Sequence, residues 1–97
     1  MIQITQYKDG LSIIGHAQYA EIGKDIVCAA VSALAQTLIY SIEELTADKI
    51  LYDIKPGTVD IKHGDLSADA QLLVDSFFLG VQAIANNYPD NVRVTKH

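Results

Sequence analysis

The stretch "DIVCAAVSALAQTLIY", residues 25–40, carries the clearest structural signal in the sequence. Its large aliphatic side chains recur at the i, i+4, i+7, i+11 spacing of one helical face: Val27, Val31, Leu34 and Leu38. Asp25 is a favourable N-cap, so we predict a helix that begins at residues 24–26 and ends near residue 41. Since apolar residues surround nearly the whole helix, we expect it to be central in the fold.

The residues before this helix predict a β-hairpin. "IQITQY" at 2–7 alternates apolar and polar side chains, and "LSIIGH" at 11–16 is the expected returning strand, ending at Gly15-His16. Asp9-Gly10 between them is a strong hairpin signal, because both central positions of such a turn need positive φ. Residues 17–24 lack a period and are predicted to form a loop.

The residues after the helix predict a second hairpin. A connector over 41–49 leads to "ILYDIK" at 50–55 and "TVDIKH" at 58–63, joined by Pro56-Gly57. Ile50, Tyr52 and Ile54 alternate in the first segment and Val59 and Ile61 in the second, which is the period of β-strands.

A second helix and a last strand complete the pattern. Ser67 is the expected N-cap, Asp69 falls in the first turn, and "NNYPD" at 86–90 ends the helix. The expected buried face is Ala70, Leu73, Val74, Phe77, Val81 and Ile84. "NVRVTK" at 91–96 is a final strand. The order is ββαββαβ, an α+β fold with a mostly antiparallel sheet packed on two helices.

Composition limits the class of protein. The 97 residues suit one domain, 1–97, and a hydrophobic fraction of 49% is enough for a packed core. The apolar surplus of so small a chain makes a homodimer plausible. The run Ile26–Ile39 is too short and too interrupted for a membrane span, and the N-terminus has no secretory signal pattern.

The charge and the cysteine content limit which binding partners and which cellular compartment we expect for this protein. The net charge of −5 comes from acidic residues spread along the chain, which suits a solvated surface or the steering of a basic partner. Direct nucleic-acid binding is disfavoured, because seven scattered Lys and Arg make no basic patch. A single cysteine forms no internal disulfide and suits a reducing cytoplasm.

Cys28 and His16 are the candidate catalytic residues. Cys28 falls about three positions into the first helix, where free N–H groups and the helix dipole favour a thiolate and can also hold an oxyanion. His16 ends a predicted strand and can project into a cleft. Cysteine is also one of the most buried residue types, and His63 and His97 are competing partners, so spacing alone leaves a structural role open.

Four neighbouring residues are candidate supports. Asp25 either orients His16 or caps the helix, and Ser32 lies one turn after Cys28 on the same face. Gly15 and Gly23 are either hinges of the loop or positions that need unusual backbone angles. No zinc-ligand spacing, phosphate loop or dinucleotide motif is present, so no metal and no cofactor are expected.

"GHAQYAEIGKDIVCAAVSAL", residues 15–34, resembles the signature of the ribosomal-processing cysteine proteases, the Prp family. The matching residues are Gly15-His16-Ala17, Gly23, Asp25-Ile26-Val27-Cys28 and Ser32. The predicted element order and the length also agree with the family.

The resemblance implies a cytoplasmic, homodimeric cysteine endopeptidase of Firmicutes-like bacteria and their relatives. Its substrate would be the large-subunit ribosomal protein numbered twenty-seven, which carries a short N-terminal extension. Cys28 would be the nucleophile and His16 the general base and acid, with Asp25 and Ser32 in support. The loop between His16 and Cys28 would be mobile and ordered by substrate. A non-catalytic ribosome-assembly or protein-binding module with an acidic surface is the alternative.

Overall fold

A five-stranded mixed sheet forms one layer of the molecule. The computed structural model describes residues 1–21 and 23–97, so Ile22 of the predicted loop lies outside the described residues. The described strands are β1 (Ile2–Tyr7), β2 (Gly10–Ile14), β3 (Ile50–Lys55), β4 (Thr58–His63) and β5 (Val92–Lys96). Their order in the sheet is β3-β4-β2-β1-β5, with β5 parallel to β1 and the other pairs antiparallel.

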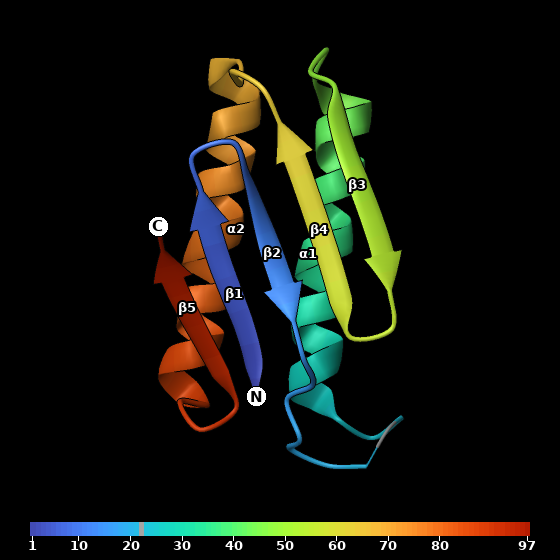
Figure 1. Cartoon of the computed structure of the whole chain (residues 1–97), viewed down its shortest axis with the longest axis vertical. Coiled ribbons are helices and arrows are strands. Elements are labelled where there is room, and N and C mark those ends of the chain that lie inside the picture. Colours follow the sequence, from blue (N-terminus) through green and yellow to red (C-terminus); the bar gives the residue numbers. More distant parts are fainter. Residues whose placement is uncertain (22) are drawn as a thin grey trace.

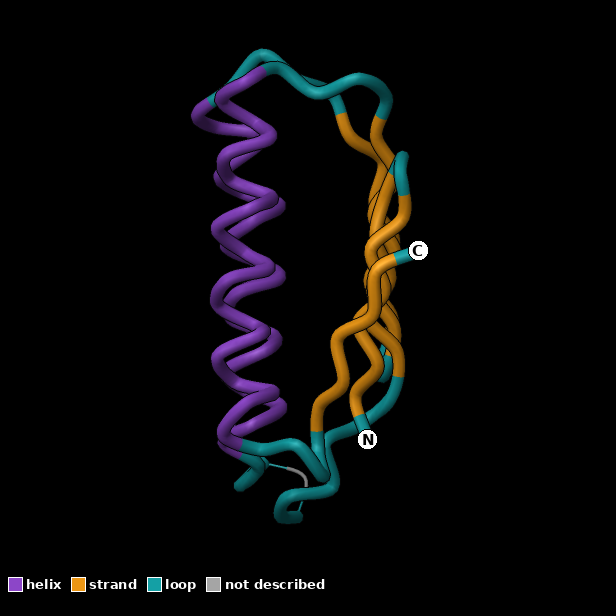
Figure 2. The backbone as a smooth tube through the Cα atoms, turned by 90° about the vertical axis from the view of Figure 1, so that its left-hand side faces the viewer, coloured by secondary structure: helices purple, strands orange, loops and turns teal. Residues whose placement is uncertain are grey.

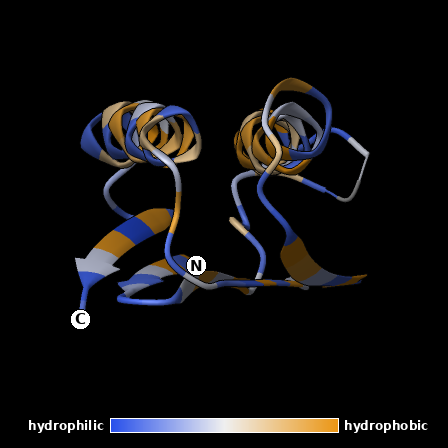
Figure 3. Cartoon of the chain, turned by 90° about the horizontal axis from the view of Figure 1, so that it is seen from above, coloured by the Kyte–Doolittle hydropathy of each residue, from blue (hydrophilic) through white to orange (hydrophobic). Residues whose placement is uncertain are grey.

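Two helices form the second layer. Helices α1 (Ile26–Leu45) and α2 (Ala68–Asn87) lie side by side on one face of the sheet (Figures 1 and 2). The predicted α+β fold and the ββαββαβ order are therefore confirmed. Seen from above, both helices turn hydrophobic residues toward the space between the layers (Figure 3).

The core lies between these two layers. Its most deeply buried large side chains come from both of them: Ile4, Ile39, Ile42, Ile61, Val27, Val81 and Val92. Alternation in β1 has a physical reason, because the helices cover only one face of the sheet and Ile2 and Ile4 point to that face. The edge strand β3 is different, since its residues 51–55 are all exposed.

Helix α1 differs from its prediction in length. It ends at Leu45 rather than near residue 41, because Ile42 continues the buried stripe and is completely buried. Thr46 then caps the helix: its backbone N–H and its hydroxyl both donate to the Ile42 carbonyl. Burial of one more turn outweighs the polar side chains of Glu43 and Glu44, which face solvent.

The position of α1 also differs from the prediction of a central helix. Its outer face is open, and Ile26, Tyr40 and Leu45 are each more than half exposed. By length and composition alone, α1 and α2 are long and apolar enough to cross a membrane, a test that core helices of soluble proteins also pass. Both helices nevertheless bury one face against the sheet, as core helices do.

The first hairpin forms as predicted, but for another reason. Tyr7 pairs with Gly10, so Lys8 and Asp9 are the central turn residues, and Gly10 begins β2 without positive φ. Glycine is required there because a Cβ would clash with the Ile61 carbonyl oxygen of β4. Strand β2 ends at Ile14, so His16 lies in the loop after the strand and not at its end.

The second hairpin and the second helix follow their predictions. Lys55 pairs with Thr58 across Pro56-Gly57, and Gly57 has a φ of +74°. Ser67 caps α2 by accepting the Ala70 N–H. The Asp48 carboxylate in turn accepts the N–H and hydroxyl of Ser67, which lowers the pKa of Asp48 and ties the end of α1 to the start of α2.

Candidate active site

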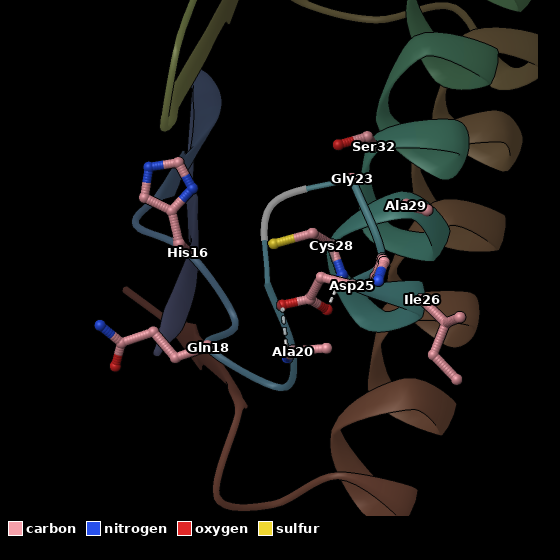
Figure 4. Close-up of a pocket in the computed structure, with 10 residues that line it drawn as sticks. His16, Gln18, Ala20, Gly23, Asp25, Ile26, Cys28, Ala29 and Ser32 are labelled. Carbon is pink, nitrogen blue, oxygen red and sulfur yellow. Dashed lines mark hydrogen bonds between the residues drawn. The ribbon is translucent and has the colours of Figure 1, made fainter.

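One end of the molecule gathers the segments that carry the candidate residues. The end of β2, the N-terminus of α1 and the β3–β4 turn all lie at the bottom of Figure 1. A pocket of about 620 Å³ opens there, and Figure 4 shows its lining. It is lined by His16, Gln18, Ala20, Gly23, Lys24, Asp25, Ile26, Cys28, Ala29 and Ser32. The structure therefore brings five of the six candidate residues to one pocket; Gly15 is outside the lining.

Cys28 is the third residue of α1 and is only partly buried. Its thiol points from the helix toward the side of the pocket where the His16 imidazole lies (Figure 4). The Sγ atom accepts a hydrogen bond of 3.2 Å from the Ala17 N–H. A backbone N–H thus points at the sulfur, and the thiol lies in the first turn of the helix. The position suits a nucleophile.

The His16 imidazole lies against the β3–β4 turn. A Cβ placed on Gly57 would come within 2.9 Å of His16 Nε2, so the ring occupies the space that a larger residue would fill. The Gly15 N–H also donates to the Gly57 carbonyl at 2.8 Å, which fixes the backbone next to His16. The turn thus limits where the imidazole can lie. His63, a competing partner by sequence, lies in β4 and lines other cavities.

Asp25 joins the loop to the helix. Its Oδ1 accepts the N–H groups of Val27 at 3.0 Å and Cys28 at 2.9 Å, and its Oδ2 accepts those of Tyr19 at 3.0 Å and Ala20 at 3.4 Å. The Cys28 N–H makes the largest contribution to lowering the pKa of the Asp25 carboxyl below its ordinary value. Both oxygens face backbone donors. The capping alternative is therefore the one the geometry favours.

This cap changes one expectation about catalysis. The sequence led us to expect free N–H groups at the helix N-terminus to hold an oxyanion. In the structure the N–H groups of Val27 and Cys28 both donate to the Asp25 carboxylate, and that of Ala29 donates to the Asp25 carbonyl. An N-cap carboxylate is a stronger acceptor than solvent, so these donors are already occupied.

The two candidate hinge glycines have different surroundings. Gly15 has a φ of +102°, and a Cβ there would clash with the Met1 carbonyl oxygen. Gly23 has a φ of +89° and open space where a Cβ would lie. Both need backbone angles that favour glycine. Their role as hinges stays a prediction.

Among the lining residues that were not candidates from the sequence, Gln18 and Lys24 are the polar ones. Lys24 adds a positive charge beside the pocket, and its place next to Asp25 was the available signal. Gln18 lies between His16 and the rest of the loop with a φ of +57°, which is unusual for a residue other than glycine. No local sequence pattern predicts this φ, because it depends on the contacts that hold the loop at each end.

The loop is also attached to the far end of the chain. The Asn91 side-chain amide donates to the Ala17 carbonyl at 2.9 Å, and the Tyr19 ring packs edge-on against Tyr88 with centroids 5.3 Å apart. Both partners belong to the segment that joins α2 to β5. These contacts were missed too, because they join residues more than sixty positions apart in sequence.

Comparison with known proteins defines the class of this chain as a cysteine protease. The family model described as cysteine protease Prp matches residues 1–93, nearly the whole chain. The chain therefore belongs to the Prp family of cysteine proteases, and the resemblance seen in residues 15–34 is confirmed. The alternative of a non-catalytic module is set aside.

Curated relatives agree with this assignment. The chain is 36% identical over 83 residues to the ribosomal processing cysteine protease Prp of Staphylococcus aureus, covering 82% of this chain and 78% of the relative. It is 32% identical over 91 residues to the protein of the same name from Bacillus subtilis, covering 84% and 79%.

Solved structures share the fold. The crystal structure of the Staphylococcus aureus Prp with a covalently linked product peptide superposes with a TM-score of 0.90 at 27% identity, covering 99% of this chain and 97% of that one. A second structure of that protease, with a substrate peptide, gives a TM-score of 0.82 over the same shares.

Replacing Asp25 separates its two contacts. In Asp25→Ala, we expect amide hydrogen exchange at Tyr19 and Ala20 to accelerate about tenfold or more, since each loses its acceptor. Asp25→Ser should keep the helix cap but not reach the loop, so exchange should accelerate at Tyr19 and Ala20 and stay slow at Cys28. Because the folded-state pKa of Asp25 is lowered, these contacts should persist at neutral pH and be lost as pH falls through that pKa. Equal protection of the Tyr19 and Ala20 amides in wild type, Asp25→Ala and Asp25→Ser would refute the contact between Asp25 and the loop.

Replacing Gly57 should move the His16 ring. Gly57→Ala adds a Cβ that approaches Nε2 at 2.9 Å, so we expect the imidazole NMR resonances of His16 to shift. Gly57→Asn tolerates positive φ better but carries the same Cβ, and it should have the same effect. Gly64→Ala is the matched control, because no atom lies within 4 Å of a Cβ there. Unchanged His16 resonances in both Gly57 variants would contradict the contact.

Proposed function

We propose that this protein removes the N-terminal extension of the large-subunit ribosomal protein numbered twenty-seven, by a Cys28–His16 mechanism, during ribosome assembly. The observation that carries the proposal is a helix N-terminal thiol that shares one open pocket with an imidazole. The curated relatives are named as ribosomal processing proteases, and a structure of one holds a substrate peptide. The acidic net charge of −5 suits a basic ribosomal protein as substrate.

The first half of the reaction forms a thioester. The Cys28 thiolate attacks the scissile carbonyl carbon, and the carbonyl oxygen takes up the negative charge. The tetrahedral intermediate then collapses: the C–N bond breaks, and the His16 imidazolium transfers its proton to the leaving amine. The new N-terminus of the substrate is released, which leaves Cys28 acylated by the extension and His16 neutral.

The second half restores the enzyme. Water attacks the thioester carbon while neutral His16 takes one of its protons. The C–S bond breaks, the extension leaves as a carboxylic acid, and the thiolate–imidazolium pair is regenerated. Every bond change is carried out by the thiol, the imidazole and water, so the proposal needs neither a metal nor a cofactor.

The supporting residues act on the geometry of this pair. Asp25 sets the start of α1, and with it the position of Cys28, through the Cys28 N–H bond of 2.9 Å. Ser32 lines the pocket one turn after Cys28, and its hydroxyl would donate a hydrogen bond into the site. Gly15 and Gly23 border the loop that would close over bound substrate. We place the reaction in the cytoplasm, where a free thiol stays reduced.

The cleavage reaction is tested with the substrate itself. The ribosomal protein carrying its extension is incubated with the wild-type protein, and mass spectrometry identifies the new N-terminus. Cys28→Ala and Cys28→Ser should abolish cleavage, and His16→Ala should reduce it by a factor of about 10² or more. His63→Ala is the matched control and should retain wild-type cleavage. Full cleavage by Cys28→Ala would disprove the proposed mechanism.

We also propose that the protein is a homodimer. Large apolar side chains remain strongly exposed on the single chain, among them Leu45, Leu51, Leu72 and Leu79, each at least 68% exposed. Sedimentation velocity at micromolar concentration should give twice the 10.6 kDa mass of one chain. A single species at 10.6 kDa across the concentration range would contradict the dimer.

A further inference from the structure

Two consecutive hydrogen bonds connect the α2–β5 turn to the Cys28 thiol. Asn91 Nδ2 donates to the Ala17 carbonyl at 2.9 Å, and the Ala17 N–H donates to Cys28 Sγ at 3.2 Å. The first joins residues 74 positions apart in the sequence. The turn after α2 therefore contacts the His16–Ala17–Gln18 backbone that faces the sulfur.

The Asn91 side chain is held on a fixed backbone. Its own N–H donates to the Tyr88 carbonyl at 2.9 Å, and its carbonyl accepts the Ile2 N–H at 2.8 Å. The turn is thus tied to α2 on one side and to the start of β1 on the other. The Asn91 side-chain amide therefore extends to Ala17 from a backbone that these two hydrogen bonds hold in place.

The Ala17 peptide needs support from its surroundings. Ala17 itself is 1% exposed, and Gln18 after it has a φ of +57°, an unfavourable angle for that residue. Such a conformation persists only where neighbouring contacts determine it. Asn91 holds the chain at Ala17, and the Asp25 carboxylate holds it at Tyr19. The two contacts lie on either side of Gln18.

We infer that the Ala17 N–H is a hydrogen-bond donor of the catalytic centre and that Asn91 is its positioning residue. The inference rests on the proposed function, in which Cys28 is the nucleophile. It is supported by the cap at Asp25, which occupies the N–H groups of Val27 and Cys28 that would otherwise face the reaction. The Ala17 N–H instead points at the reacting atom.

This donor has a use at two points of the reaction. Before attack, its hydrogen bond stabilises the negative charge on sulfur. As the S–C bond forms, the electron pair of the carbonyl π bond moves onto oxygen, and the charge passes from sulfur to that oxygen. The Ala17 N–H, which already lies next to the sulfur, can then donate a hydrogen bond to the oxyanion. That hydrogen bond becomes shorter and stronger as the charge on the oxygen grows.

Asn91→Ala tests the positioning role. Asn91 has no positive φ, and its two backbone hydrogen bonds do not depend on its side chain, so alanine is compatible with the turn. Asn87→Ala is the matched control, an exposed asparagine at the end of α2. Wild type and both variants are compared by thermal unfolding, by the pH profile of iodoacetamide alkylation at Cys28, and by kcat and KM on the extended ribosomal protein.

We expect Asn91→Ala to lower kcat about tenfold with little change in KM, the effect of one weakened hydrogen bond to a charged group. Alkylation should need a higher pH to reach half its maximal rate. His16, Lys24 and Asp25 are the titratable groups that line the pocket with Cys28, and all three stay unchanged in this variant. Asn87→Ala should match the wild type. A folded Asn91→Ala protein with wild-type kcat and an unshifted alkylation profile would overturn the inference.

A second variant decides the case where Asn91→Ala does not fold. Chemical synthesis of the chain with an ester in place of the His16–Ala17 peptide bond removes the Ala17 N–H and leaves the carbonyl that Asn91 contacts. The same upward shift of the alkylation profile and the same loss of kcat are expected, and their absence would overturn the donor role. If wild type does not cleave the ribosomal protein, the proposed function fails on that result alone, while the alkylation profile still reports on the N–H contact to sulfur.

Discussion

The carboxylate of Asp25 makes the contact on which the site depends. One oxygen caps α1 through Val27 and Cys28, and the other holds the loop through Tyr19 and Ala20. A single ionised side chain therefore sets the position of the thiol and the course of the loop in front of it. Because every partner is a backbone N–H group, the arrangement needs the carboxylate but not particular side chains around it.

The two-layer fold supplies the rest of the geometry. In the sheet, the end of β2 lies beside the β3–β4 turn. In the helix layer, the start of α1 lies at the same end of the molecule (Figures 1 and 4). His16 follows β2, and the lack of a side chain at Gly57 leaves room for its imidazole. The turn after α2 adds Asn91. Residues 15–32 thus meet two segments far away in the sequence, the β3–β4 turn and the turn after α2, at this end of the molecule.

Much of the fold could be predicted because its signals are local. The spacing of Val27, Val31 and Leu38 reports burial on one helical face, and Asp25 and Ser67 are caps whose chemistry acts within three residues. Alternation along residues 50–55 predicted a strand correctly, although residues 51–55 are exposed in the structure. Two expectations about the fold were wrong, and each has a physical cause. Burial of Ile42 extended α1 beyond its predicted end, and close approach to Ile61, not turn angle, explains Gly10.

The sequence by itself determined the element order and both helix caps, because each depends on residue type and short spacing. Its resemblance to the Prp family marked His16 and Cys28 as the candidate pair. The tertiary structure alone decided which N–H groups face the sulfur, where the imidazole lies, and that the segment after α2 supports the loop. Those features depend on contacts such as Asn91 to Ala17, which span 74 positions. Local spacing carries no information about them, since only packing of the two layers brings such residues together.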